Sequence, residues 1–173
     1  MKEKGYIQVY TGNGKGKTTA SLGLALRSAG AGYKVFIGQF LKSGDYSEIG
    51  ALKRFDDLIT VKQFGAPRFI KDKVHDEDRL LAEKGVAQLC RILDSEEYDV
   101  VIAEELNVAV YLGVIPLEDA LYLMSRKGEN TELIITGRYA PEEIIARADL
   151  VTEMTEIKHY YNEGVSARTG IEK

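Results

Sequence analysis

The chain has 173 residues and a formal net charge of −4, which argues against non-specific binding to nucleic acid. Its single cysteine cannot form an internal disulfide and its two histidines offer little for a zinc site, so we expect a reducing, cytoplasmic setting. No apolar run resembles a signal peptide or a membrane span, and the length fits one domain over residues 1–173.

The first predicted strand, residues 6–10, is followed by a glycine-rich loop at 11–19 and then by a predicted helix at 20–27. A strand, a loop that closes with Gly-Lys-Thr, and a helix are what a phosphate-binding P-loop requires. Glycines let backbone N–H groups turn toward phosphate oxygens, and the helix N-terminus adds partial positive charge. We therefore expect Lys17 to reach the phosphates of a nucleotide and Thr18 to hold Mg²⁺.

The loop departs from the usual P-loop spacing. Four residues normally separate the first glycine from Gly-Lys-Ser/Thr, which would place a glycine at Thr11, whereas Gly12 makes this loop one residue shorter. A glycine-rich turn with a chance Lys-Thr is the competing interpretation, but the flanking strand and helix both favour the P-loop. The shorter loop suggests that the nucleotide lies differently from the way it does in a GTPase.

After the P-loop helix, strands and helices alternate along the chain. The pattern predicts strands at 34–40, 58–63, 98–106, 131–138 and 150–154, and helices at 48–55, 76–95, 117–126 and 141–148. A tight strand–helix–strand unit implies parallel strands with a right-handed crossover. Together these elements predict an α/β fold with a mostly parallel central sheet and helices on both faces.

Charged residues lie at the ends of two predicted strands. In P-loop proteins an apolar strand ends in an acid that holds the metal ion, and here such a strand ends in Glu104 and Glu105. Glu105 is a candidate Mg²⁺ ligand or, in a hydrolase, the group that orients water. Arg138 lies just past another strand, where ligands of open α/β sheets bind, and can clamp a polyphosphate. A surface salt bridge is the alternative for Arg138, and also for Arg27 on the P-loop helix.

The segment from Phe64 to Ile70 is irregular because Gly65 and Pro67 interrupt it. Exposed apolar residues on a loop often mark a binding surface. Phe64 and Phe69 either line such a surface or pack into the core, and the sequence does not favour one interpretation over the other.

Several motifs occur in order along the chain. They are Thr11–Thr19, Gln39–Lys42, Glu104–Asn107, Ile135–Arg138 and Lys158–Glu172. On these motifs the chain resembles, over nearly its whole length, the P-loop type of ATP:corrinoid adenosyltransferase (cob(I)yrinic acid a,c-diamide adenosyltransferase). The Gly-Asn-Gly-Lys-Gly-Lys-Thr-Thr loop and the Lys-x-x-x-x-x-Gly-Val tail are the parts specific to that family.

The resemblance implies a RecA-like P-loop fold and a homodimer. It implies transfer of the 5′-deoxyadenosyl group of ATP to the Co(I) of a reduced corrinoid, with release of inorganic triphosphate, in adenosylcobalamin synthesis or salvage. It further implies that ATP lies reversed in the P-loop relative to other P-loop enzymes, and that a flavoprotein supplies the electrons. The preferred corrinoid is not specified.

Carried over to this chain, the resemblance assigns ATP and Mg²⁺ to particular residues. The ATP-binding set consists of Gly12, Asn13, Gly14, Lys15, Gly16, Lys17, Thr18, Thr19, Arg27 and Arg138. Lys17 and Arg138 steady the triphosphate where charge develops, and Thr18 and Glu105 bind Mg²⁺. These last four residues form the predicted catalytic set.

This chain departs from the family pattern at three places. Its acidic pair is Glu-Glu where the family usually has Asp-Glu, which leaves the role of Glu104 open. Only five residues precede the first predicted strand, so we expect the N-terminal lid of some members to be missing or built differently. In some members a Phe and a Trp crowd the lower corrin face; this chain has no Trp, and Phe64 and Phe69 are the candidate corrinoid contacts.

Three other functions compete with adenosyl transfer. An ATPase or regulatory P-loop switch would use Glu105 to position water. A small-molecule kinase would carry an arginine-rich lid, and the sequence has no such cluster. A corrinoid- or nucleotide-binding module without turnover is the third. Co(I) is a strong nucleophile with no proton to remove, so a transferase needs no general base, and the sequence shows no nucleophile–base pair.

Overall fold

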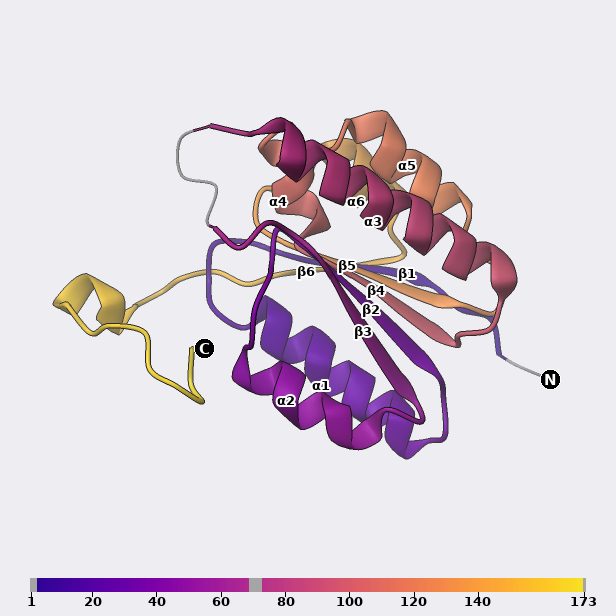
Figure 1. The fold of residues 1–173 in the computed structure, drawn as a ribbon, viewed down its shortest axis with the longest axis horizontal. Helices are drawn as coiled ribbons and strands as arrows, with labels where there is room; N and C mark the ends of the chain where they lie inside the picture. The colour runs from indigo at the N-terminus through magenta and orange to yellow at the C-terminus, as the bar shows by residue number, and fades with distance from the viewer. Residues whose placement is uncertain (1–2, 69–72, 173) are drawn as a thin grey trace.

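The computed structural model describes residues 3–68 and 73–172 as a central sheet between two layers of helices (Figure 1). Within these residues the sheet has six strands in the order β3-β2-β4-β5-β1-β6, and all neighbouring strands are parallel. The strands are β1 Ile7–Thr11, β2 Val35–Phe40, β3 Ile59–Phe64, β4 Val100–Glu104, β5 Glu132–Thr136 and β6 Leu150–Glu153. The predicted parallel α/β sheet, of the kind found in RecA-like P-loop folds, is confirmed.

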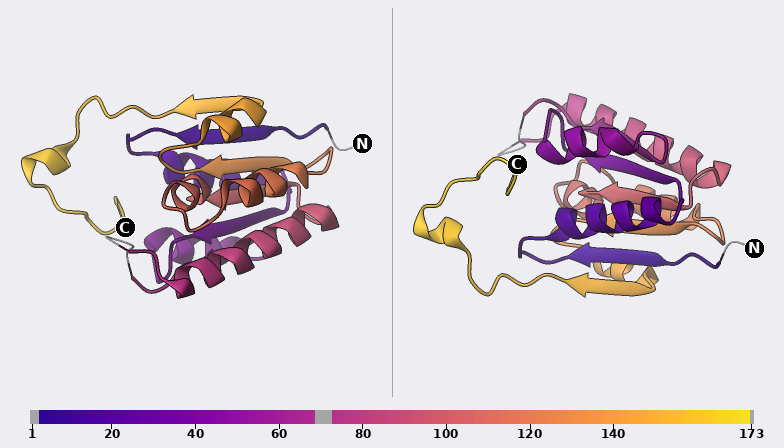
Figure 2. Two further views of the ribbon diagram at one scale, coloured as in Figure 1. Left: turned by 90° about the horizontal axis from the view of Figure 1, so that it is seen from above. Right: turned by 90° about the horizontal axis from the view of Figure 1, so that it is seen from below.

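Helices cover both faces of the sheet (Figures 1 and 2). One face carries α1 Lys17–Gly30 and α2 Ser47–Leu52, and the other carries α3 Asp76–Ser95, α4 Leu106–Tyr111, α5 Leu117–Ser125 and α6 Glu142–Arg147. Short 3-10 helices follow α2 at Lys53–Phe55 and lie in the C-terminal segment at Tyr160–Glu163. In the part of the chain that the structure describes, no helix is both long and apolar enough to cross a membrane.

Alternation of side chains along the strands divides the core between the two faces. On β2, Phe36 and Phe40 pack in the cluster that contains α3 and α5, whereas Val35 and Ile37 pack in the cluster that contains α1 and α2. Both faces of the central strands are therefore buried. This is why these strands appear in the sequence as continuous apolar runs rather than alternating ones.

The predicted strand at 98–106 is too long at its end. β4 stops at Glu104, because Glu105 adopts a left-handed conformation with a φ of 61° and α4 begins at the next residue. The sequence analysis did not predict α4, whose run Leu-Asn-Val-Ala-Val-Tyr is rich in β-branched residues. Its helix forms because Leu106 and Ala109 are fully buried against the sheet, which overrides local propensity.

Candidate functional site

The loop between β1 and α1 has the backbone geometry that a phosphate-binding loop requires. Gly12 and Gly16 have φ values of 92° and 122°, which residues with side chains rarely adopt. A Cβ on Gly14 would lie 2.7 Å from the carbonyl oxygen of Met154, and the Gly14 N–H donates to that same oxygen at 2.6 Å. The chain just after β6 therefore packs directly against the loop.

Lys17, the first residue of α1, turns its ammonium group into this loop. Its Nζ donates to the carbonyl oxygens of Gly12 and Gly14, both at 2.7 Å, and the residue is only 7% exposed. Burial and, next, the charge of Arg138 lower the pKa of Lys17. A phosphate oxygen could replace the loop carbonyls as a stronger, oppositely charged partner for this ammonium.

Glu105 lies beside the loop at the carboxyl end of β4. Its N–H donates to Thr136 Oγ1 at 3.1 Å, which ties the turn after β4 to the end of β5. Burial raises the pKa of Glu105, and the positive charges of Lys42 and Lys17 oppose that rise. The carboxylate therefore lies within electrostatic reach of Lys17.

Arg138 follows β5 and is exposed at the same edge of the sheet. The residue before it, Gly137, has a φ of 132°, and a Cβ there would lie 3.0 Å from Asn107 of α4. Close packing of this turn on α4 thus fixes where Arg138 leaves the sheet. Because β4, β5 and β1 are neighbouring parallel strands, Glu105, Arg138 and the loop that leads to Lys17 leave the sheet at the same edge. The charge of Arg138 also lowers the pKa of Lys17 and opposes the rise at Glu105.

The remaining predicted ATP contacts divide into two groups. On or next to the loop lie Gly12, Asn13, Gly14, Lys15, Gly16, Thr18 and Thr19. Thr18 is half-buried in the first turn of α1. Arg27 lies in the last turn of that helix, about 15 Å along its axis from Lys17. The structure does not bring Arg27 to the loop, and its contact with ATP stays a prediction.

The structure describes only one of the two candidate corrinoid contacts, Phe64 and not Phe69. Phe64, the last residue of β3, is half-buried with its ring centroid 5.8 Å from that of Phe40. Its ring lies over Gly85 of α3, where a Cβ would come within 2.8 Å of it. Phe69 lies outside the described residues. A contact between either phenylalanine and a corrinoid stays a prediction.

The sequence analysis assigned no role to a buried polar network at the ends of β2, β3 and β4. Glu104 is fully buried, and it accepts hydrogen bonds from Gln39 Nε2 at 2.5 Å and Lys42 Nζ at 2.7 Å. Gln63 Nε2 donates to Gln39 Oε1 at 3.1 Å. Burial lowers the pKa of Lys42, but the nearby carboxylates, Glu104 foremost, together reverse this and raise it. Glu104 therefore holds Lys42 in place, and Glu105 is the acid of the pair that is left for a ligand.

Two tyrosines near Arg138 also escaped the sequence analysis. The rings of Tyr111 on α4 and Tyr139 stack with their centroids 4.2 Å apart, and both residues are about half exposed or more. Tyr139 has a φ of 60°, a costly conformation for a residue with a bulky side chain. No local sequence pattern pairs these two residues, which lie 28 positions apart in the chain.

The oxygen donors at this site fit Mg²⁺ bound together with a nucleotide. Within residues 3–68 and 73–172 there is no cluster of three or more His, Cys, Asp or Glu side chains that could hold a metal ion. Mg²⁺ usually takes only one or two protein oxygens and completes its shell with phosphates and water. The Glu105 carboxylate and the Thr18 hydroxyl are ligands of that kind.

Comparisons with known proteins agree over almost the whole chain. A family model described as ATP:corrinoid adenosyltransferase BtuR/CobO/CobP matches residues 3–172. A corrinoid adenosyltransferase of Escherichia coli strain K12 is 36% identical over 171 residues, which cover 98% of this chain and 86% of that protein. A corrinoid adenosyltransferase of Pseudomonas aeruginosa is 30% identical and covers 98% and 84%. Corrinoid adenosyltransferase CobA of Salmonella typhimurium is 33% identical and covers 99% and 87%.

Proposed function

The chain belongs to the ATP:corrinoid adenosyltransferase family, and we propose that it transfers the 5′-deoxyadenosyl group of ATP to the Co(I) of a reduced corrinoid at the site described above. The protein is thus a transferase of cobalamin synthesis. Two observations support placing this activity at the site. Lys17 Nζ lies inside the glycine loop against the carbonyl oxygens of Gly12 and Gly14. Glu105 and Arg138 follow the neighbouring parallel strands β4 and β5 at the same edge of the sheet.

The main catalytic requirement of this reaction is to stabilise the leaving triphosphate. The Co(I) electron pair attacks C5′ of ATP, the C5′–O bond breaks, and the triphosphate leaves with the bonding electrons as the cobalt–carbon bond forms. Negative charge grows on the triphosphate during this step. Lys17 and Arg138 are the cations that would stabilise it, and the N–H groups of the loop would hold the phosphates. Orientation of C5′ toward cobalt supplies the rest of the rate.

Glu105 and Thr18 would hold Mg²⁺ at this site. When bound, Mg²⁺ withdraws charge from the phosphate oxygens as a Lewis acid. The protein's part is to keep the carboxylate and the hydroxyl in reach, which the Glu105–Thr136 hydrogen bond supports. We expect Thr18→Ala to raise the Mg²⁺ concentration needed for half-maximal activity.

We also propose a cytoplasmic homodimer that receives electrons from a flavoprotein. The family resemblance supports these statements, and the edge strand β6 offers apolar surface for a second copy. Leu150 and Val151 on that strand are 45% and 41% exposed. Light scattering on the purified chain would test the dimer, and a monomer mass at working concentration would contradict it.

An anaerobic spectrum tests the activity directly. The protein is mixed with chemically reduced cobalamin, ATP and Mg²⁺ while the Co(I) absorption and inorganic triphosphate are followed together. Loss of Co(I), an alkyl-cobalt spectrum and triphosphate release should appear at the same rate. Lys17→Ala should abolish all three, whereas Lys53→Ala, at an exposed lysine after α2, should not. Persistent Co(I) with accumulating orthophosphate would instead identify a hydrolase with Glu105 positioning water.

A further inference from the structure

The C-terminal segment returns to the P-loop after leaving the body of the protein. Beyond β6 the chain extends past the edge where the strands end and then turns back (Figures 1 and 2). Lys15 on the loop donates from Nζ to the carbonyl oxygen of Ile171 at 3.0 Å and to Glu172 Oε1 at 3.3 Å. The end of the described chain is therefore tied to a residue of the candidate ATP site.

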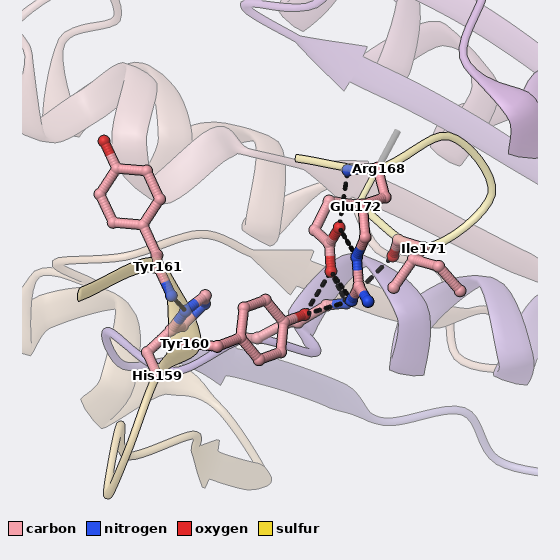
Figure 3. Close-up of polar contacts among 7 residues, drawn as sticks. His159, Tyr160, Tyr161, Arg168, Ile171 and Glu172 are labelled. Carbon is pink, nitrogen blue, oxygen red and sulfur yellow. Dashed lines mark hydrogen bonds and ion pairs between the residues drawn. The ribbon is translucent and has the colours of Figure 1, made fainter. Parts of the chain in front are cut away.

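Glu172 is the centre of a polar cluster in this segment (Figure 3). Arg168 donates to its carboxylate from the backbone N–H at 2.8 Å, from Nε at 3.2 Å and from Nη2 at 3.0 Å, and the Tyr160 hydroxyl donates to it as well. The Arg168 guanidinium also lies 5.0 Å from the centroid of the Tyr160 ring. These three residues hold the returning segment in a closed loop.

Glu172 does not depend on Lys15 for its stability. A carboxylate has about four lone-pair positions, and Arg168 and Tyr160 together already offer it that many donors. If Lys15 leaves, the Glu172 charge stays paired with Arg168, so no buried charge is left without a partner. The segment from the end of β6 to Tyr161 adds little support of its own, since Ile157 and Tyr161 are 96% and 70% exposed.

We propose that Lys15 exchanges Glu172 for the triphosphate of ATP, and that Glu172 is a positioning residue that sets nucleotide affinity through Lys15. This inference rests on the proposed function, because a bound polyphosphate is what gives Lys15 a better partner. Three phosphates carry more charge than a carboxylate already neutralised by Arg168, and charge-assisted hydrogen bonds strengthen accordingly. Nucleotide binding then releases the C-terminal segment from the loop, and departure of triphosphate restores the contact.

Titration calorimetry of the full chain with inorganic triphosphate and Mg²⁺ tests the exchange. Glu172→Gln removes the charge that competes for Lys15. The Kd of this variant for triphosphate should therefore be about two- to five-fold lower than that of the unsubstituted chain, the range expected for a partly exposed ion pair. The matched control is Glu163→Gln, since Glu163 lies in the same segment but pairs with Lys158 at 3.6 Å, and the Kd of this variant should stay unchanged. The KM for ATP in Glu172→Gln should fall by the same factor while kcat does not rise. A role in folding alone would raise KM, and an unchanged or weaker Kd overturns the proposal.

A fluorescent reporter follows the segment itself. The chain has no tryptophan, so Ile171→Trp, at a residue that is 56% exposed, introduces a single tryptophan that can be excited selectively over the tyrosines. Triphosphate should lower its anisotropy, and the change should disappear when Lys15→Ala is added. Constant anisotropy despite binding overturns the exchange and leaves the proposed function standing. If the unsubstituted chain does not bind triphosphate at all, the proposed nucleotide site fails and the exchange fails with it.

Discussion

Lys42 and Glu104 form an ion pair of 2.7 Å in which the Glu104 side chain has no exposure and the Lys42 side chain only 18%. Burying two charges costs several kcal/mol, which only good geometry and further hydrogen bonds can offset. Gln39 supplies such a bond to the second carboxylate oxygen. The pair thus places a fixed positive charge beside Glu105 at the edge of the sheet where the site lies.

Breaking this pair from the lysine side should be costly. Lys42→Met leaves Glu104 buried and charged without its cation, and we expect the free energy of unfolding to fall by about 3–5 kcal/mol. The double variant Lys42→Met with Glu104→Gln should recover most of that loss, because no charge remains buried. Urea denaturation of the single and double variants measures both values.

The matched control for this cycle is an exposed ion pair. Arg126 and Asp94 are also 2.7 Å apart, but their side chains are 41% and 42% exposed. Arg126→Met should therefore cost far less than Lys42→Met, because solvent screens an exposed pair. If Lys42→Met costs equally little, the folded protein does not depend on Lys42 to compensate for the burial of Glu104.

The predicted residues that lie together at the edge of the sheet all follow local signals in the sequence. Lys17 follows a glycine loop, and Glu105 and Arg138 follow buried strands whose parallel ends must meet at one edge. The contacts that the sequence analysis missed join residues far apart in the chain. Lys42 acquires its position from Glu104, 62 residues away. Lys15, a predicted ATP contact, meets Glu172 only because the C-terminal segment folds back. The strand predicted at 98–106 extends beyond the end of β4, because the left-handed turn at Glu105 contains no glycine that would indicate a turn in the sequence.

Gly14 should not tolerate a side chain. Its Cβ would lie within 2.7 Å of the Met154 carbonyl oxygen, which is backbone and cannot rotate away. Gly14→Ala should therefore shift the loop, lower the free energy of unfolding by about 1–3 kcal/mol and weaken binding of triphosphate. On α1, a Cβ at Gly23 meets nothing within 4 Å, so Gly23→Ala should stabilise by up to about 1 kcal/mol. Equal effects of the two substitutions in thermal melts and binding assays would contradict the packing of Met154 on the loop.

Lys17 should make stability and activity respond to pH in opposite directions. Its pKa in the folded protein is lowered, first by burial, from an ordinary value of 10.5. Between the lowered pKa and 10.5 the unfolded chain binds more protons at this residue, so the free energy of unfolding rises with pH. At pH values below the lowered pKa, Lys17 is protonated in both states and the added unfolding free energy is lost. The difference in unfolding free energy between the unsubstituted chain and Lys17→Met should therefore increase as pH approaches 10.5.

Activity should show the reverse trend, because in the proposed mechanism only the ammonium form of Lys17 would stabilise the leaving triphosphate. As pH rises, the kcat/KM for ATP should begin to fall at a pH below the pKa of an ordinary lysine. Denaturation and rate measurements over the same pH series test both statements. A stability difference that is flat with pH would mean that Lys17 has the same pKa in both states.

The stacked rings of Tyr111 and Tyr139 should contribute a measurable coupling energy. Aromatic pairs of this geometry are worth about 0.5–1.5 kcal/mol beyond the area they bury. Tyr111→Ala, Tyr139→Ala and the double variant form a cycle in which alanine keeps the φ strain at Tyr139 nearly constant, since it is also a residue with a Cβ. We expect coupling toward the lower end, because Tyr111 and Tyr139 are 60% and 48% exposed. Additive losses in urea denaturation would mean that the rings do not stay stacked in solution, and the strained turn after Arg138 would then be held by the packing of Gly137 on α4 alone.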